Sequence, residues 1–307
     1  MTDQLPKRIK TISEYHKLRQ LPPPEHPLVS VVDYAAMSSS PEADEAPGLL
    51  FDFYMISVKR GMEGKLFYGQ QSYDFDEGIM FFMSPHQVLR VERNPSKKVA
   101  RSGWLLLIHP DFLWNTALAK HIRKYDYFDY AINEALFLSE KEEATINNIV
   151  LNIRQEYRNN MDRFCQPIIL SLLETLLNYA DRFYQRQFIT RKQSNHRVLE
   201  QMEQLLEDYF NGNDLSAKGL PTVLYIAGKL NVSMGYLGSL LRSLTGMNTQ
   251  QHIHEKLIEK AKERLATTSL SVSEIAYELG FEHPQSFSKL FKLKTGNSPL
   301  AFRQAYN

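Results

Sequence analysis

Residues 271–296 read SVSEIAYELGFEHPQSFSKLFKLKTG, and this stretch decides the fold of the C-terminal part of the chain. Ser271 and Glu274 have the S-x-x-E spacing of a capping box, so a helix should begin directly after Ser271. Gly280 can adopt the left-handed conformation that ends such a helix. Pro284 suits the first turn of the next helix. The stretch therefore predicts a helix-turn-helix, two short helices joined by a tight turn.

The same pattern occurs once more, earlier in the chain. Residues 226–246 repeat the apolar positions, the turn and the final Thr-Gly of residues 275–296, at an offset of 49 residues that becomes 50 after the turn. Asn231 stands where Gly280 stands, and asparagine tolerates the left-handed backbone best after glycine. Apolar residues recur every four positions from Gln250 to Thr267, which predicts one amphipathic helix between the two copies. Two such units on one rigid body should enter successive major grooves of DNA, ~34 Å apart.

Residues 218–307 resemble the DNA-binding domain of the AraC/XylS family of bacterial transcription regulators. The resemblance is carried by Ile275-Ala276-Tyr277-Glu278-Leu279-Gly280-Phe281 and Ser286-Phe287-Ser288-Lys289-Leu290-Phe291-Lys292, and it continues from Lys294 through Pro299 to Phe302-Arg303. It implies a regulator that binds double-stranded promoter DNA in a sequence-specific way. It also implies RNA polymerase as a partner, a homodimer, and a small-molecule effector or partner protein acting at the N-terminal domain.

The resemblance also implies which residues contact DNA. In the second unit the base-reading positions carry Gln285, Ser286 and Lys289; glutamine can pair bidentately with adenine, and lysine can reach guanine or a phosphate. In the first unit the matching positions are Gly235, Gly238 and Ser239, with Tyr236 beside them. These glycines depart from the family's habit of long polar side chains, so we expect the first unit to read DNA shape, phosphates or few bases, unless Tyr236 or Arg242 contributes. Tyr236 and Ser239 are its candidate base-reading residues. The expected phosphate contacts are Arg242, Lys292, Lys294 and Arg303.

Charge agrees with this assignment. The whole chain has 36 basic and 35 acidic side chains. From Lys218 to Asn307 it has 11 Lys and Arg against 6 Asp and Glu, a net charge of +5. Positive charge therefore collects where DNA should bind, and binding should weaken as salt rises.

The N-terminal part has a different pattern, and the chain as a whole is expected to be an α+β multidomain protein. Residues 1–27 are polar and predict an arm. Residues 28–135 contain short apolar runs separated by turn-forming residues, as in a small sandwich or barrel.

The family resemblance implies a cupin-like β-barrel here. A metal-binding cupin needs an H-x-H pair, a glutamate and a later histidine, whereas His86 and His109 stand alone, so we expect no metal and no cofactor. The aromatic side chains of this region either line a pocket or form an ordinary strand core.

Helices should follow the β-rich region. Ser139 and Glu142 form another capping box, and the apolar stripe of residues 168–183 fits either an intrachain helix pair or a dimer interface. We therefore assign residues 136–189 to a helical dimerisation or connector segment, 190–197 to a polar linker, and 198–307 to the all-α DNA-binding domain. The only cysteine is Cys165, and no apolar run is long enough to span a membrane, which together indicate a cytoplasmic protein.

Two alternatives from other classes remain. One is an enzyme that uses a metal-free cupin-type barrel. The other is a protein-interaction adaptor that keeps the helical repeat without reading DNA, an idea to which Gly235 and Gly238 lend some weight.

Overall fold

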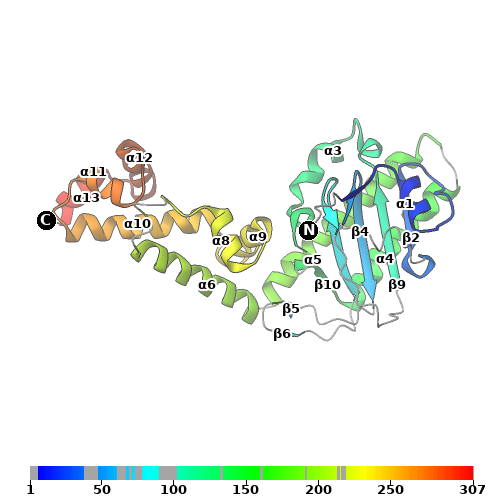
Figure 1. Cartoon of the computed structure of the whole chain (residues 1–307), viewed down its shortest axis with the longest axis horizontal. Coiled ribbons are helices and arrows are strands. Elements are labelled where there is room, and N and C mark those ends of the chain that lie inside the picture. The colour runs from blue at the N-terminus through cyan, green and yellow to red at the C-terminus, as the bar shows by residue number, and fades with distance from the viewer. Residues whose placement is uncertain are drawn as a thin grey trace. The chain divides into compact units, whose positions relative to one another are not determined.

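The computed structural model describes residues 6–37, 48–60, 67–68, 71–72, 78–89, 102–131, 134–159, 162–190, 192–212, 215 and 219–306. They form two compact units, Met1–Gln187 and Phe188–Asn307. All the described strands belong to the first unit, and the described elements of the second are helices (Figure 1). This confirms the expected division into a β-containing N-terminal region and a helical C-terminal region.

A five-stranded antiparallel sheet is the centre of the first unit, with the strand order β10-β7-β4-β9-β2. Its strands are β2 (Val29–Asp33), β4 (Tyr54–Arg60), β7 (Gly78–Met83), β9 (Ser102–Ile108) and β10 (Leu136–Leu138). In a second sheet β3 (Leu49–Phe51) pairs with β1 (Lys7–Ile9) in parallel and with β8 (Val88–Leu89) in antiparallel fashion. Strands β5 (Phe67–Tyr68) and β6 (Gln71–Ser72) pair with each other.

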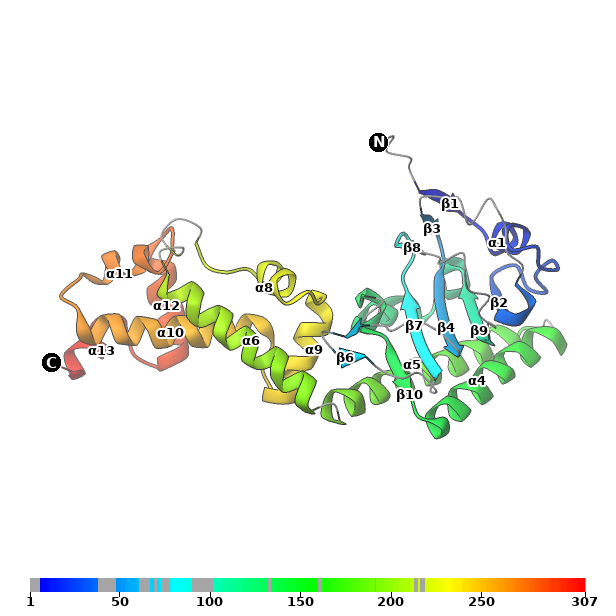
Figure 2. The same ribbon diagram turned by 60° about the horizontal axis from the view of Figure 1, so that its bottom comes forward.

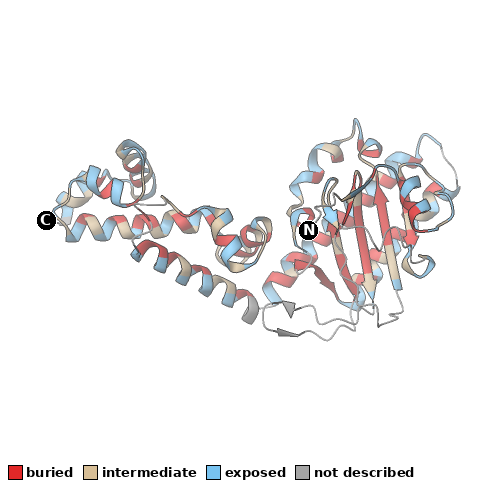
Figure 3. Ribbon diagram, in the orientation of Figure 1, coloured by how far each residue is buried: buried red, intermediate tan, exposed pale blue. Residues whose placement is uncertain are grey.

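The helices of the first unit cover the five-stranded sheet. They are α1 (Ile12–Leu18), η1 (Tyr34–Ala36), η2 (Pro110–Leu113), α3 (Ala117–His121), η3 (Ile122–Lys124), η4 (Asp126–Asp129), α4 (Glu140–Asn159) and α5 (Cys165–Thr190). Helices α4 and α5 run along one face of the sheet (Figure 2). Because side chains alternate along a strand, Leu106 lies with Ile153 and Ile169 on that face, whereas Leu105 packs with Ile12 and the second sheet on the other. Successive residues of the strands therefore face two different cores. Much of the five-stranded sheet is accordingly coloured as buried in Figure 3.

Three predictions for the first unit need correction. The described strands form three separate sheets rather than one closed barrel. The expected polar arm contains β1 and α1, whose residues Ile9, Ile12 and Tyr15 are buried in the core, because the apolar residues there alternate with charged ones that face solvent. The helical segment expected from residue 136 begins with β10, which extends the sheet along β7.

Most of the apolar residues for which the sequence left two roles possible, pocket or strand core and dimer interface or helix pair, lie in the core. Phe51 and Phe53 pack around Tyr15, with ring centroids 5.9 and 6.2 Å from its ring. On α5 the intrachain alternative holds for the inner half of the stripe, where Ile169, Leu173, Leu176, Leu177 and Ala180 are all buried. Ile168 remains 42% exposed.

The second unit is a set of helices around one apolar core. They are α6 (Lys192–Asn211), α8 (Val223–Leu230), α9 (Met234–Thr245), α10 (Thr249–Thr267), α11 (Val272–Glu278), α12 (Pro284–Thr295) and α13 (Pro299–Tyr306). Leu257, Ala261 and Leu265 of α10 are almost fully buried in this core, as the four-residue periodicity predicted. No helix in the described part of the chain is both long and apolar enough to cross a bilayer.

The polar linker predicted over 190–197 is not an irregular segment. Helix α5 extends to Thr190, and residues 192–197 form the beginning of α6; Arg191 lies outside the described residues. Asn195 is 1% exposed, and its side-chain amide donates to the backbone oxygen of Phe188 (2.7 Å), so this polar stretch is packed against the preceding residues of the chain.

Candidate DNA-binding interface

The second helix-turn-helix consists of α11 and α12, and local chemistry sets where each helix starts and stops. The amide of Glu274 donates to the Ser271 hydroxyl (3.2 Å), and the Glu274 carboxylate accepts from the amide of Ser271 (2.6 Å), which is the predicted capping box. The bond from the Ser271 amide holds the pKa of Glu274 below its usual value. Gly280 has φ +80°, and a Cβ there would lie 2.9 Å from the backbone oxygen of Leu215. Both the left-handed turn and the close approach therefore require glycine.

Aromatic side chains fix the inner face of α12. Phe287 and Phe291 are fully buried, and their rings lie 5.5 Å from those of Phe281 and Phe302. Pro284 occupies the first turn, as predicted. The helix is therefore held in one rotation about its axis, with a polar outer face on which Gln285, Ser286, Lys289 and Lys292 are all exposed.

The first helix-turn-helix consists of α8 and α9 and repeats this construction with different residues. Thr222 and Ser233 cap the two helices, each accepting a bond from a backbone amide three residues on. Asn231 ends α8 with φ 55°, the left-handed conformation predicted for it. Helix α9 has 12 residues, as α12 does.

Helix α10 connects the two helix-turn-helix units. A capping box fixes its start, and polar side chains along it contact α6. Asn248 and Gln251 form a capping box at its start. On its side, Lys256 makes an ion pair with Glu207 of α6, and the amine of Lys260 donates to the Asn211 side chain (2.8 Å). These contacts tie α10 to α6, and the apolar core that α10 shares with α8, α9, α11 and α12 holds the two helix-turn-helix units within one body.

Comparison with known proteins agrees with this geometry. Residues 226–305 match a family model described as a helix-turn-helix domain. The uncharacterized HTH-type transcriptional regulator YfiF of Bacillus subtilis (strain 168) is 31% identical over 146 residues, 48% of this chain and 43% of YfiF. The HTH-type transcriptional activator RhaR of Cronobacter sakazakii (strain ATCC BAA-894) is 39% identical over 70 residues, 23% of this chain and 25% of RhaR. The C-terminal part of the chain therefore contains a helix-turn-helix domain similar to those of AraC-family regulators.

These matches are partial. The chain spans less than half the length of either curated relative. Among solved structures, the DNA-binding domain of AdpA in complex with a target DNA is 28% identical, covers 36% of this chain and 91% of that chain, and has a TM-score of 0.31.

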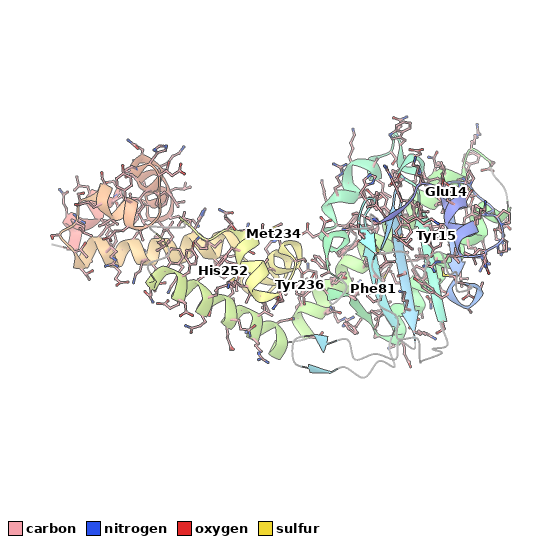
Figure 4. All side chains as sticks on the ribbon, in the orientation of Figure 1. Glu14, Tyr15, Phe81, Met234, Tyr236 and His252 are labelled. Carbon is pink, nitrogen blue, oxygen red and sulfur yellow. The ribbon has the colours of Figure 1, made fainter. Side chains whose placement is uncertain are left out.

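The helix-turn-helix domain does not expose every predicted DNA contact. Tyr236, labelled in Figure 4, is 1% exposed. Its ring lies 5.3 Å from that of Phe188 in an edge-to-face arrangement. Burial raises the pKa of its hydroxyl. The prediction that Tyr236 reads bases is wrong for this structure, because a side chain enclosed in the core cannot reach a base edge. Tyr236 lies four residues before the buried Leu240, and this helical spacing was the signal that favoured a core role.

Two predicted phosphate contacts are engaged inside the domain. The Nε of Arg303 donates to the backbone oxygen of Leu265 (3.2 Å), and its Nη2 is buried. The guanidinium therefore closes the end of α10, and we correct its assignment from DNA contact to structural contact. The amine of Lys294 lies 3.0 Å from the carboxylate of Glu255, which offsets its charge.

In the first helix-turn-helix, the remaining candidates for DNA contact are polar residues of α9. Ser239 is half-buried and Arg242 is exposed. The Nε of Arg242 donates to the backbone oxygen of Gly238 (3.2 Å). Met234, at the start of the helix, is 49% exposed.

Proposed function

We propose that this protein is a transcription regulator that binds promoter DNA in a sequence-specific way, with α9 and α12 in two successive major grooves. The observation that carries this proposal is the repeat itself: two recognition helices of equal length, each fixed by a capped turn and both packed on α10. A helix presented in this way fits a major groove about 12 Å wide.

We assign distinct roles to the exposed residues of α12. The amide of Gln285 suits adenine, and the amine of Lys289 suits guanine or a phosphate. Ser286 can bond to any of several base edges. Lys292, one turn after Lys289, is exposed and suits a phosphate, which positions the protein without specifying sequence.

A selection from random duplex DNA at near-physiological salt tests the proposal with the full chain. Two enriched elements about one helical turn (~10 bp) apart would support bipartite reading. Enrichment of one element would restrict sequence reading to α12. Weak binding without enrichment would overturn the proposal and favour the adaptor alternative, which rests on Gly235 and Gly238. The enzyme alternative would instead require turnover of a substrate, and the relatives are named as regulators.

For the first unit we infer a cupin-like sensing role, in which an effector or partner protein changes DNA binding. The support comes from Gln187 and Phe188, the two consecutive residues at which one unit ends and the next begins. Gln187 is 1% exposed in the first unit, where its side chain accepts from the amide of Phe137 (2.9 Å) and donates to Ala135 (3.2 Å). Phe188, the next residue, is fully buried against Tyr236 of α9. Consecutive residues of one helix are thus fixed in the cores of both units.

We further infer a homodimer that acts on RNA polymerase in the cytoplasm, as the family resemblance implies. The support for dimerisation is the presence of exposed apolar side chains on α4 and α5. Leu151 is 51% exposed and Ile168 is 42% exposed. Sedimentation of the purified protein tests this: a monomer at micromolar concentration would exclude these helices as a stable dimer interface.

A further inference from the structure

Helix α9 lacks side chains where a recognition helix needs them. At an offset of 50 residues, Gly235 and Gly238 take the places of Gln285 and Ser288 of α12. Within α9, Arg242 is the single charged residue. If the first helix-turn-helix reads sequence, the long polar side chain that contacts the base must therefore come from another turn of α9.

The conformation of Arg242 supplies such a side chain. Helical side chains lean toward the N-terminus, over the turn that precedes them. The Nε of Arg242 accordingly reaches the backbone oxygen of Gly238 (3.2 Å), and a Cβ built on Gly238 would lie 3.5 Å from the Nη2 of Arg242. A Cβ at position 238 would thus be in ordinary van der Waals contact with the guanidinium, which lies over that position. The guanidinium lies one turn closer to the N-terminal half of α9 than its own Cα does.

We propose that Arg242 is the base-reading residue of the first helix-turn-helix and that it recognises a guanine with a guanidinium that lies over Gly238. The proposal rests on the function proposed above. The planar guanidinium matches the O6 and N7 acceptors of guanine with two parallel bonds. The bond from Nε to Gly238 directs the plane of the guanidinium, and its Nη groups make the contact with the base.

Reading a base and contacting a phosphate have different consequences. A bidentate pair with guanine discriminates against other bases by about 5- to 150-fold, and lysine does not reproduce its geometry. A phosphate contact adds affinity on all sequences, and lysine largely keeps it.

The test is the same DNA selection, carried out with the full-length wild type, Arg242→Lys and Arg242→Ala. Wild type should enrich guanine at one position of the first element, and both variants should lose that preference. The preferences in the second element, set by α12, should stay unchanged in both variants. That unchanged element also shows that the variants are folded.

A second variant, at Gly238 one helical turn before Arg242, tests the proposal without removing a charge. Gly238→Gln fills the space under the guanidinium and places an adenine-reading side chain there, so the preferred base should change from guanine at that position. Uniformly weaker binding of Arg242→Ala with unchanged base preferences would overturn the proposal in favour of a phosphate contact. A wild type that enriches only the second element would overturn it while leaving DNA binding intact. A wild type that enriches nothing would refute the proposed function itself.

Discussion

Gln285 and Lys292 lie two turns apart on the exposed face of α12, yet they should affect DNA binding differently. Gln285→Ala should relax base preference at one position, with a loss of about 1–3 kcal/mol of discrimination, because adenine loses a bidentate partner. Lys292→Ala should weaken binding to all sequences and reduce the slope of log K against log salt by about 1. Titrations on a site library at several salt concentrations separate the two effects. Unchanged preference in Gln285→Ala would remove this residue from the readers.

Tyr236 belongs to the core of the second unit, and its substitution should therefore change stability. Tyr236→Ala removes a ring that is 1% exposed and packs on Phe188. Loss of a buried aromatic ring costs about 3–5 kcal/mol in the free energy of unfolding. Tyr236→Phe keeps the ring and is the matched control. Denaturant unfolding measures the first effect, and a site library should show wild-type preferences for Tyr236→Phe. A changed base preference in that variant would restore Tyr236 as a reader.

At the scale of the element, α11 depends on the charge of Glu274 as well as on its hydrogen bond. The pKa of Glu274 is lowered in the folded state, first by the bond from the Ser271 amide. A lowered folded-state pKa means that the carboxylate stabilises the fold above its unfolded pKa and loses this contribution as pH falls through the folded pKa. Glu274→Gln keeps a capping side chain without the charge. The stability difference between wild type and this variant, followed by thermal unfolding, should therefore be present at neutral pH and vanish in acid. A difference independent of pH would contradict this account.

The elements that the sequence predicted well are those whose ends are marked by local chemistry. Ser271, Gly280 and Asn231 each act on neighbouring backbone groups, so spacing alone identified both helix-turn-helix units. The errors concern pairings between distant segments. Strand β1, in the segment expected to be an arm, forms because residues 7–9 pair with residues 49–51 of β3, far along the chain. The burial of Tyr236 likewise depends on Phe188, which lies in a stretch that is polar on average. Arg303 illustrates the same limit, because a cation suited to a phosphate also suits the carbonyl groups at the end of a helix.

At the scale of the whole molecule, the junction between Gln187 and Phe188 should transmit changes from the first unit to DNA binding. Gln187→Leu removes the side-chain partners of two backbone groups, the Phe137 amide and the Ala135 carbonyl, and leaves them buried. We expect this variant to change the DNA affinity of the full chain, although residue 187 belongs to the first unit. Trp104→Phe is the matched control, because it removes a bond to Asn147 (2.7 Å) in the same unit, far from the junction in the chain. Equilibrium binding of both variants to one selected duplex measures the effect. Coupling through the junction requires that Gln187→Leu change the affinity more than Trp104→Phe does. Equal effects, or none, would mean that the first unit acts on DNA binding by another route.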